Sequence, residues 1–254
     1  MRRSPRLVPA LVLVAAFALW ELAVHTLRIP PYLLPPPSML AARIAEDWRL
    51  IADNSWVTLQ EVLIGFGLAA AVSIPLAALL QRFRVLEEAL YPLLVSSQTI
   101  PKVAIAPLLV VWFGFGAIPK ILIAFLVCFF PILIDTLAGL QALPREVRWL
   151  ARSMGATGWD TLVKIRIPAA LPNIFSGLKV ASTLAVVGAV VGEFVGSDRG
   201  LGHLLIVANG TMNVQLAFAV LIVLSVMGVV LFAAVEMLER ALLPWHVSQR
   251  MARQ

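Results

Sequence analysis

Six apolar runs, each about as long as a membrane-spanning helix, constrain this chain more than any other feature of its sequence. A helix that crosses the hydrocarbon core of a bilayer needs roughly 20 predominantly apolar residues. The six runs cover residues 8–27, 58–80, 89–113, 118–140, 174–196 and 216–238. Only 13% of the residues are charged, whereas a soluble domain carries roughly a quarter. We therefore expect an all-α polytopic membrane protein with about six transmembrane helices.

The basic residues are distributed unevenly between the two sides of these runs. Fourteen of the 20 Lys and Arg residues fall on the side that carries both termini, five fall on the other side, and Lys102 lies inside the third run. Loops that stay in the cytoplasm are enriched in Lys and Arg, so both termini are expected in the cytoplasm. Membrane orientation thereby accounts for the net charge of +6, and we expect no nucleic-acid partner.

The residue types that build catalytic and metal sites are scarce and scattered. The sequence has a single cysteine, Cys128, and its three histidines lack ligand spacing with one another or with a thiol or carboxylate. No nucleophile and base stand in a recognisable arrangement, and the Gly-x-x-x-x-Gly-Lys-Ser/Thr phosphate loop is missing from the sequence. We predict neither catalytic residues nor a metal site in this chain.

The longest segment on the basic side, residues 141–172, is amphipathic. Pro144 can open a helix at its first turn, and Gly155 is expected to end it. The apolar positions of this helix are Val147, Leu150, Ala151 and Met154, and its basic positions are Arg145, Arg148 and Arg152. A second short helix is expected over residues 159–167, before Pro168 and Pro172. Such a pair fits either the groove of a cytoplasmic partner or the surface of the bilayer.

The third apolar run is interrupted in its middle by the residues Gln98, Thr99, Ile100, Pro101 and Lys102. A proline kinks a helix, and such a break at membrane depth is tolerated where it is buried in protein or lines a wet cavity. Ionisable groups within spans are costly and mark candidate functional positions. Candidates for a translocation pathway are Gln98, Thr99, Lys102 and Glu193. Alternatively, Lys102 binds a carbonyl freed by Pro101, and Glu193 reaches the membrane interface or pairs with Lys102.

Gly188, Gly192 and Gly196 recur every four residues in the fifth run. Small residues at this spacing let helix backbones approach closely. This helix-packing seam can lie between two copies of the chain, flanking a pore, or between helices of one copy.

On the side opposite the termini, residues 34–38 read Leu-Pro-Pro-Pro-Ser and form a stiff extended segment. Ser38 can cap a helix over residues 39–53 with Leu40, Ile44, Trp48 and Ile51 on one face. That helix either lies in the membrane interface or packs on the protein as a solvated loop helix. We divide the chain into an N-terminal helix with this outer segment (residues 1–55), a core of five transmembrane helices with the amphipathic segment (56–245), and a cytoplasmic tail (246–254).

The amphipathic segment resembles the cytoplasmic loop of type I importer permeases of the ATP-binding-cassette (ABC) class. That loop reads Glu-Ala-Ala, three residues, Gly, nine residues, Ile-x-Leu-Pro. This chain has Trp149-Leu150-Ala151, three residues, Gly155, nine residues and Ile165-Arg166-Ile167-Pro168. It departs from the pattern at Trp149 and Ile167. Further similarity, to the nitrate, sulfonate and taurine branch, is carried by residues 34–38, 112–116, 168–172 and 200–202, and the resemblance covers roughly residues 30–245.

The resemblance implies the permease subunit of an ATP-driven importer of the bacterial inner membrane. It implies a second permease copy, two cytoplasmic ATPase subunits, and a periplasmic or lipid-anchored binding protein. ATP and Mg²⁺ would be bound by the ATPase, and no cofactor by this chain. The residues implied in ATPase docking are Arg148, Trp149, Ala151, Met154, Gly155, Ala156, Trp159, Ile165 and Pro168.

The substrate is left open between two kinds of solute. Residues 183–196, with Val186 and Val187, resemble the subset that handles pyrimidine precursors of thiamine, riboflavin or other aromatic compounds. The alternative substrate is an anion of the sulfonate, taurine or nitrate type. A different class of function is a stand-alone ion-coupled transporter, which would show repeat symmetry and buried relay carboxylates.

Overall fold

The computed structural model describes residues 7–244, apart from the side chains of residues 7–10, Arg84, Glu87 and Arg148. Within this range the chain is helical and forms no strand. The helices are α1 Leu7–Thr26, α2 Pro37–Glu46, α3 Trp48–Arg82, α4 Arg84–Ser97, α5 Lys102–Phe113, α6 Ala117–Gln141, α7 Arg145–Ser153, α8 Gly158–Thr161, the π-helix η1 Leu162–Arg166, α9 Ile167–Gly196, α10 Leu201–Gly210 and α11 Val214–Leu242. The predicted tail, residues 246–254, lies outside the described residues.

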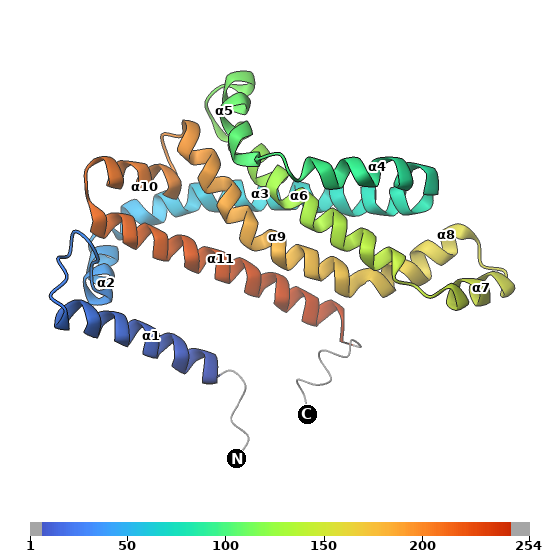
Figure 1. Cartoon of the computed structure of the whole chain (residues 1–254), viewed down its shortest axis with the longest axis horizontal. Coiled ribbons are helices and arrows are strands. Elements are labelled where there is room, and N and C mark those ends of the chain that lie inside the picture. Colours follow the sequence, from blue (N-terminus) through green and yellow to red (C-terminus); the bar gives the residue numbers. More distant parts are fainter. Residues whose placement is uncertain (1–6, 245–254) are drawn as a thin grey trace, which may run out of the picture.

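Four long apolar helices form the body of the described structure (Figure 1). α6 packs closely against α3 and α9, and α11 packs mainly against α9. α4 and α5 together have the composition of a fifth span, but they meet at 91°. α1, whose described apolar part is Leu11–Thr26, lies beside α2 and contacts α11 through the rings of Trp20 and Phe218. The predicted all-α membrane fold is confirmed.

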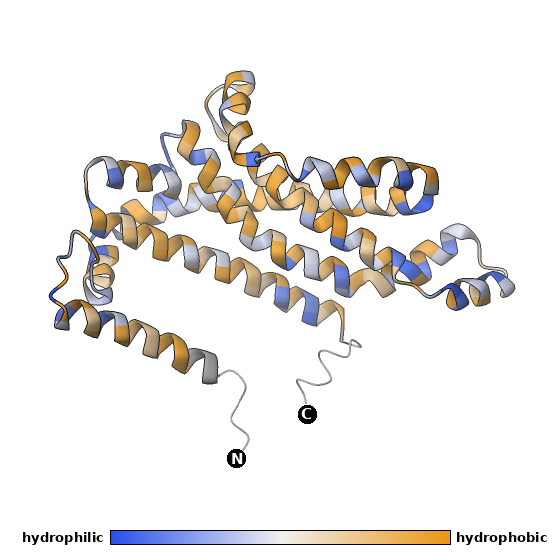
Figure 2. Ribbon diagram, viewed as in Figure 1, coloured by the Kyte–Doolittle hydropathy of each residue, from blue (hydrophilic) through white to orange (hydrophobic). Residues whose placement is uncertain are grey.

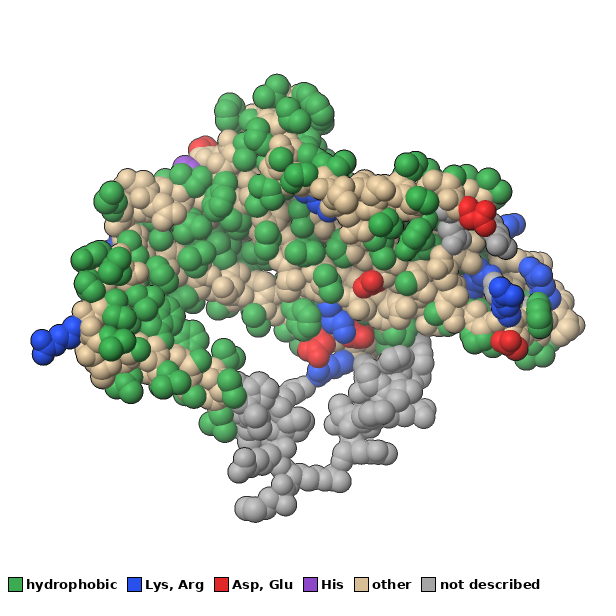
Figure 3. Space-filling model, in the orientation of Figure 1, with side chains coloured by type: hydrophobic (Ala, Val, Ile, Leu, Met, Phe, Trp, Pro, Cys, Tyr) green, Lys and Arg blue, Asp and Glu red, His purple; other side chains and the backbone are tan. Residues whose placement is uncertain are grey.

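The bundle helices and the segment at one of their ends differ in hydropathy (Figure 2). The bundle helices are predominantly apolar, whereas α7 and α8, beyond the ends of α6 and α9, carry many polar residues. Figure 3 shows hydrophobic side chains over most of the visible face and a group of Lys and Arg side chains at the end that holds α7 and α8. α10 lies at the opposite end of the bundle.

The glycines of α9 bring α9 and α6 into backbone contact. A Cβ atom at Gly188 would stand 2.7 Å from Cα of Ala124, and one at Gly192 would stand 2.7 Å from Cα of Lys120. From the other side, Gly65 of α3 approaches Ala124 equally closely. A Cβ atom at Gly196 would meet side chains rather than backbone, namely the ring of Phe115 and a methyl group of Val110. Gly188 and Gly192 are therefore buried between helices of one chain, and their face of α9 is not free to form a seam with a second copy.

Replacing Gly192 by leucine is expected to destabilise the fold by about 3 kcal/mol or more, because the side chain must displace the backbone of α6. Gly67→Leu is the matched control, since nothing lies within 4 Å of a Cβ atom at that exposed position of α3. Thermal unfolding of both variants in mild detergent, followed by size-exclusion chromatography, makes the comparison. Equal stability of the two variants would contradict the close α6–α9 contact.

The second short helix, predicted to end before Pro168 and Pro172, is not separate. α8, η1 and α9 form one continuous helix from Gly158 to Gly196. In η1 the N–H of Ile167 donates to the carbonyl of Leu162, five residues earlier. This wider turn changes the hydrogen-bond register just before Pro168, so the missing N–H of that proline does not end the helix. The expectation that the prolines stop the helix was therefore wrong.

The predicted outer helix over residues 39–53 is also wrong in its extent. α2 ends at Glu46, and residues 48–53 belong to α3, so the domain boundary drawn after residue 55 falls inside a continuous helix. At the joint, Asp47 binds Arg43 at 2.7 Å. Ser38 does not cap α2. Its N–H and hydroxyl instead donate to the carboxylate of Glu21 at 3.0 and 2.7 Å.

Candidate functional site

The turn between α7 and α8 is built around Gly155. Gly155 has a φ of +82°, a conformation that residues with a Cβ atom rarely adopt. The N–H of Gly155 donates to the carbonyl of Arg152, and the N–H of Ala156 donates to that of Ala151, both at 3.0 Å. These two bonds form the Schellman motif that ends many helices. Nothing lies within 4 Å of a Cβ atom at Gly155, so backbone conformation alone requires glycine here.

α8 starts with a capping box that fixes its direction. The N–H of Asp160 donates to the hydroxyl of Thr157 at 3.1 Å, and the N–H of Thr157 donates to the carboxylate of Asp160 at 3.3 Å. Lys164 pairs with the same carboxylate at 2.6 Å. Lys164 and the Thr157 contacts lower the pKa of Asp160 to about 2. Asp160 therefore keeps its charge, and the cap is retained at every physiological pH.

Large apolar side chains are exposed on both sides of this turn. Trp149, Met154 and Trp159 are 65%, 79% and 69% exposed. Ala151 is buried, while Ala156, Ile165 and Pro168 are partly buried. The side chain of Arg148 lies outside the described part of the chain. An exposed apolar group of this size, flanked by Arg145 and Arg152, has the composition of a protein-binding surface.

The break in the third apolar run is a sharp bend between α4 and α5. The helix stops at Ser97, Gln98 and Thr99 follow as its last turn, and Pro101 precedes the first residue of α5. Lys102 places its Nζ atom 4.8 Å from the centre of the Phe130 ring on α6. The Lys102 side chain is therefore engaged in a cation–π contact with α6. The suggested pairing of Lys102 with Glu193 is wrong.

Glu193 belongs instead to a buried polar cluster at the opposite end of the bundle from α7. It is 1% exposed and accepts hydrogen bonds from the hydroxyl of Thr58, at 2.6 Å, and from the N–H of Gly202. Beside it, Lys120 of α6 forms an ion pair with Glu61 of α3, and both are at most 5% exposed. Glu193 thus lies in the protein interior rather than at the membrane interface.

The same cluster fastens α10 to the bundle. The N–H of Gly200 donates to Asn54 at 2.7 Å, and the N–H of Leu201 donates to Thr58 at 2.8 Å. With the bond from Gly202, side chains of α3 and α9 satisfy three N–H groups at the start of α10, where a helix has no internal acceptors. The Glu193 carboxylate occupies the space of a Cβ atom at Gly200, which explains why glycine is required there.

Sequence reasoning missed this cluster because its members come from distant parts of the chain. Lys120 is one of the five basic residues that the sequence assigns to the outer side, yet it is buried, and its Nζ also donates to Ser197 at 2.9 Å. The available signal was that Glu61 and Lys120 are ionisable residues close to the ends of apolar runs, where burial requires a partner. Which residues pair depends on helix packing, which the sequence pattern does not give.

Comparisons with known proteins give consistent matches. The sequence profile of the family described as binding-protein-dependent transport system inner membrane component matches residues 64–244. The formylaminopyrimidine transport permease of Halalkalibacterium halodurans is 36% identical over 98% of this chain and 100% of that protein. The riboflavin transport system permease of Chloroflexus aurantiacus is 38% identical over 96% of this chain and 92% of that protein.

Among solved structures, an inward-facing structure of the MetNI methionine ABC transporter matches with a TM-score of 0.68. The sequences are 21% identical, and the match covers 77% of this chain and 97% of that one. At this identity the likeness concerns the fold alone.

Proposed function

Because this chain belongs to the family of binding-protein-dependent transport system inner membrane components and is the permease of an ABC importer, we propose that it carries a small, uncharged heteroaromatic solute into the cell. The substrate would be a pyrimidine or a riboflavin-like compound, handed over by an external binding protein. Membership of this family sets aside the stand-alone ion-coupled transporter.

The observation that carries the coupling part of this proposal is the turn at Gly155. It presents Trp149, Met154 and Trp159 at the far end of the molecule, where a cytoplasmic ATPase subunit would bind them in a groove. Two such ATPases, binding ATP and Mg²⁺, would act on two permease copies, most simply a homodimer. This arrangement assigns α7, α8 and both termini to the cytoplasm and α10 to the outer side, as the Lys and Arg distribution predicts.

Alternating access would then follow from changes in packing between the ATP-bound and ATP-free states. In this proposal the bend between α4 and α5 contributes Gln98, Thr99 and Lys102 to the pathway, because it exposes polar groups at membrane depth. Glu193 is assigned a different role. It accepts hydrogen bonds within a closed cluster and holds α10 in place.

The charges inside the spans favour an uncharged substrate. An anion pathway would be helped by positive charge without a counter-charge. Among the described residues, however, Lys120 pairs with Glu61, and Lys179 pairs with Glu239 at 2.8 Å. Lys102 keeps its charge, but its ammonium group is held by a cation–π contact with the ring of Phe130. Formylaminopyrimidine and riboflavin, for which two relatives are named, are aromatic solutes of the kind that this charge balance favours.

Uptake into proteoliposomes tests the proposal. The permease is reconstituted with its ATPase and binding protein, and ATP-dependent uptake of formylaminopyrimidine, riboflavin and taurine is compared. We expect uptake of one of the two aromatic solutes and none of taurine. Liposomes without ATP, and liposomes with only the binding protein omitted, are the controls. Uptake of taurine alone would contradict the substrate assignment while leaving the importer mechanism intact.

A further inference from the structure

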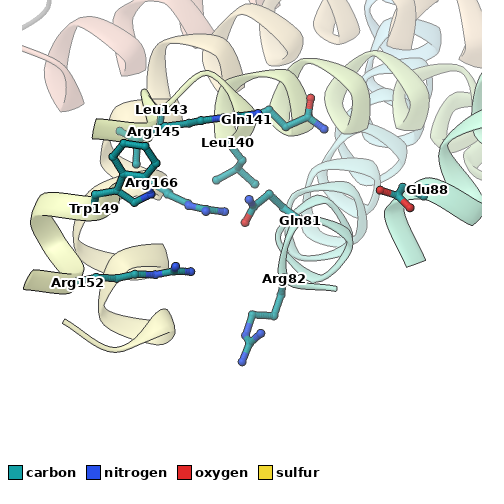
Figure 4. A pocket seen from close by; sticks show the side chains of 10 residues that line it. All are labelled: Gln81, Arg82, Glu88, Leu140, Gln141, Leu143, Arg145, Trp149, Arg152 and Arg166. Atoms are coloured by element: carbon teal, nitrogen blue, oxygen red, sulfur yellow. The ribbon is translucent and has the colours of Figure 1, made fainter. Parts of the chain in front are cut away.

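A polar cleft of about 700 Å³ lies between the end of the bundle and α7 (Figure 4). Four arginines line it: Arg82, Arg145, Arg152 and Arg166. In Figure 4 the side chains of Arg152 and Arg166 extend toward the end of α3, where Gln81 lies. One carboxylate, Glu88 of α4, stands at the opposite side of the cleft. Trp149, one of the predicted docking residues, also lines the cleft, but neither it nor the pathway candidates account for this concentration of positive charge.

The position of the cleft relative to the membrane follows from the helices that line it. Arg82 is the last residue of α3, Gln141 is the last residue of α6, and Arg166 immediately precedes α9. All three helices are long enough to span a membrane. Their ends on one side therefore lie at the depth of the lipid headgroups. On the orientation proposed above, this is the cytoplasmic leaflet.

The chemistry of the cleft fits a phosphate. A guanidinium group is always charged and presents its N–H donors in a planar fork that matches phosphate oxygens. Among the described residues that line the cleft, four such groups stand beside one carboxylate, so the lining carries an excess of positive charge that favours an anion. Basic pockets between the cytoplasmic ends of spanning helices are suited to anionic lipid headgroups.

We propose that this cleft binds the phosphate of an anionic lipid headgroup, such as phosphatidylglycerol, from the cytoplasmic leaflet. A lipid rather than a free anion is favoured because the cleft is formed at the ends of three spans. Arg145 and Arg152 belong to α7, whereas Arg82 and Arg166 belong to the bundle. One bound phosphate would therefore connect the ATPase-docking segment to the spanning helices. The proposal rests on the orientation of the proposed function, but not on its substrate.

Native mass spectrometry of the full chain, purified in mild detergent, can count retained lipids. The probes are phosphatidylglycerol and phosphatidylcholine with identical acyl chains. The variants Arg82→Gln and Arg166→Gln are compared with Arg240→Gln, which removes a charge from the same end of the molecule at a residue paired with Glu236. Arg166→Lys keeps the charge and tests whether loss of lipid merely reflects misfolding.

We expect the natural chain, Arg240→Gln and Arg166→Lys to retain phosphatidylglycerol in preference to phosphatidylcholine. Arg82→Gln and Arg166→Gln should each lower that retention about fivefold or more, as expected for a Lys or Arg that contacts anionic lipid. Equal retention by all variants would overturn the proposal. The proposal would also be overturned if the chain bound inorganic phosphate in the cleft but showed no preference between the two lipids. The site would then serve a free anion. Since no ATPase is needed, a permease that fails to couple can still confirm the lipid site.

Discussion

Replacing Gly155 by valine is expected to reduce ATP-driven uptake at least about tenfold, because a residue with a Cβ atom held at a φ of +82° costs ~1–3 kcal/mol. A β-branched side chain is the least tolerant of this conformation. The turn would relax toward a negative φ, and the Schellman bonds to Arg152 and Ala151 would be lost. α7 and α8 would then no longer present Trp149 and Trp159 to one partner. Uptake and ATPase co-purification are measured on the same preparation.

Two further variants separate backbone strain from added bulk. Gly158→Val adds the same side chain three residues later, where φ is ordinary and nothing lies within 4 Å of a Cβ atom, so uptake should stay near normal. Gly155→Asn should recover much of the loss, because asparagine tolerates the left-handed region better than valine does. Normal uptake by Gly155→Val, or equal losses in both valine variants, would refute the assigned role of this turn.

The second large effect is expected at Lys120. Lys120→Met should destabilise the protein by about 3–5 kcal/mol, because it leaves the Glu61 carboxylate buried without its partner. The loss should reach α10 as well, since Lys120 also binds Ser197 beside the start of that helix. Equilibrium unfolding in mixed detergent and SDS micelles measures the change. Limited proteolysis of the 197–202 connection reports on the release of α10.

A double substitution and a surface control make this measurement specific. Adding Glu61→Leu to Lys120→Met should recover at least about 2 kcal/mol, because the unpaired charge is then removed. Lys164→Met breaks an ion pair whose lysine is 73% exposed, and should change stability by no more than about 1 kcal/mol. A Lys120→Met variant as stable as Lys164→Met would show that the buried pair contributes nothing.

The parts of this fold that could be predicted are those set by local composition. The lengths of the apolar runs predicted the four long bundle helices, and Pro101 marked the place where α4 and α5 separate. The position of Gly155 marked the end of α7, because a left-handed residue at a helix terminus is usually glycine. Each of these features depends on a few neighbouring residues and is therefore visible in the chain before folding.

The features that escaped prediction depend on packing across the bundle. Pro168 was expected to end a helix because proline lacks a backbone N–H, yet the helix continues past it after the π-turn of η1. Glu193 was placed in the pathway because its partner Thr58 is 135 residues away and could not be identified. The cleft at the end of α3 was missed for the same reason, since Arg82 and Arg152 are far apart in the sequence and line one cleft only in the folded chain.

The continuity of the helix from Gly158 to Gly196 has a mechanical consequence. At 1.5 Å per residue its 39 residues form a lever about 58 Å long, on which a tilt of about 10° at one end displaces the other by about 10 Å. In the proposed arrangement the Gly158 end would lie at the ATPase, and the other end lies where Glu193 and Ser197 bind α10 and α6. In that arrangement a small tilt imposed at the ATPase end would become a displacement of about 10 Å at the other end of the helix. The buried polar cluster would transmit this displacement, because it joins the end of α9 to α3, α6 and α10.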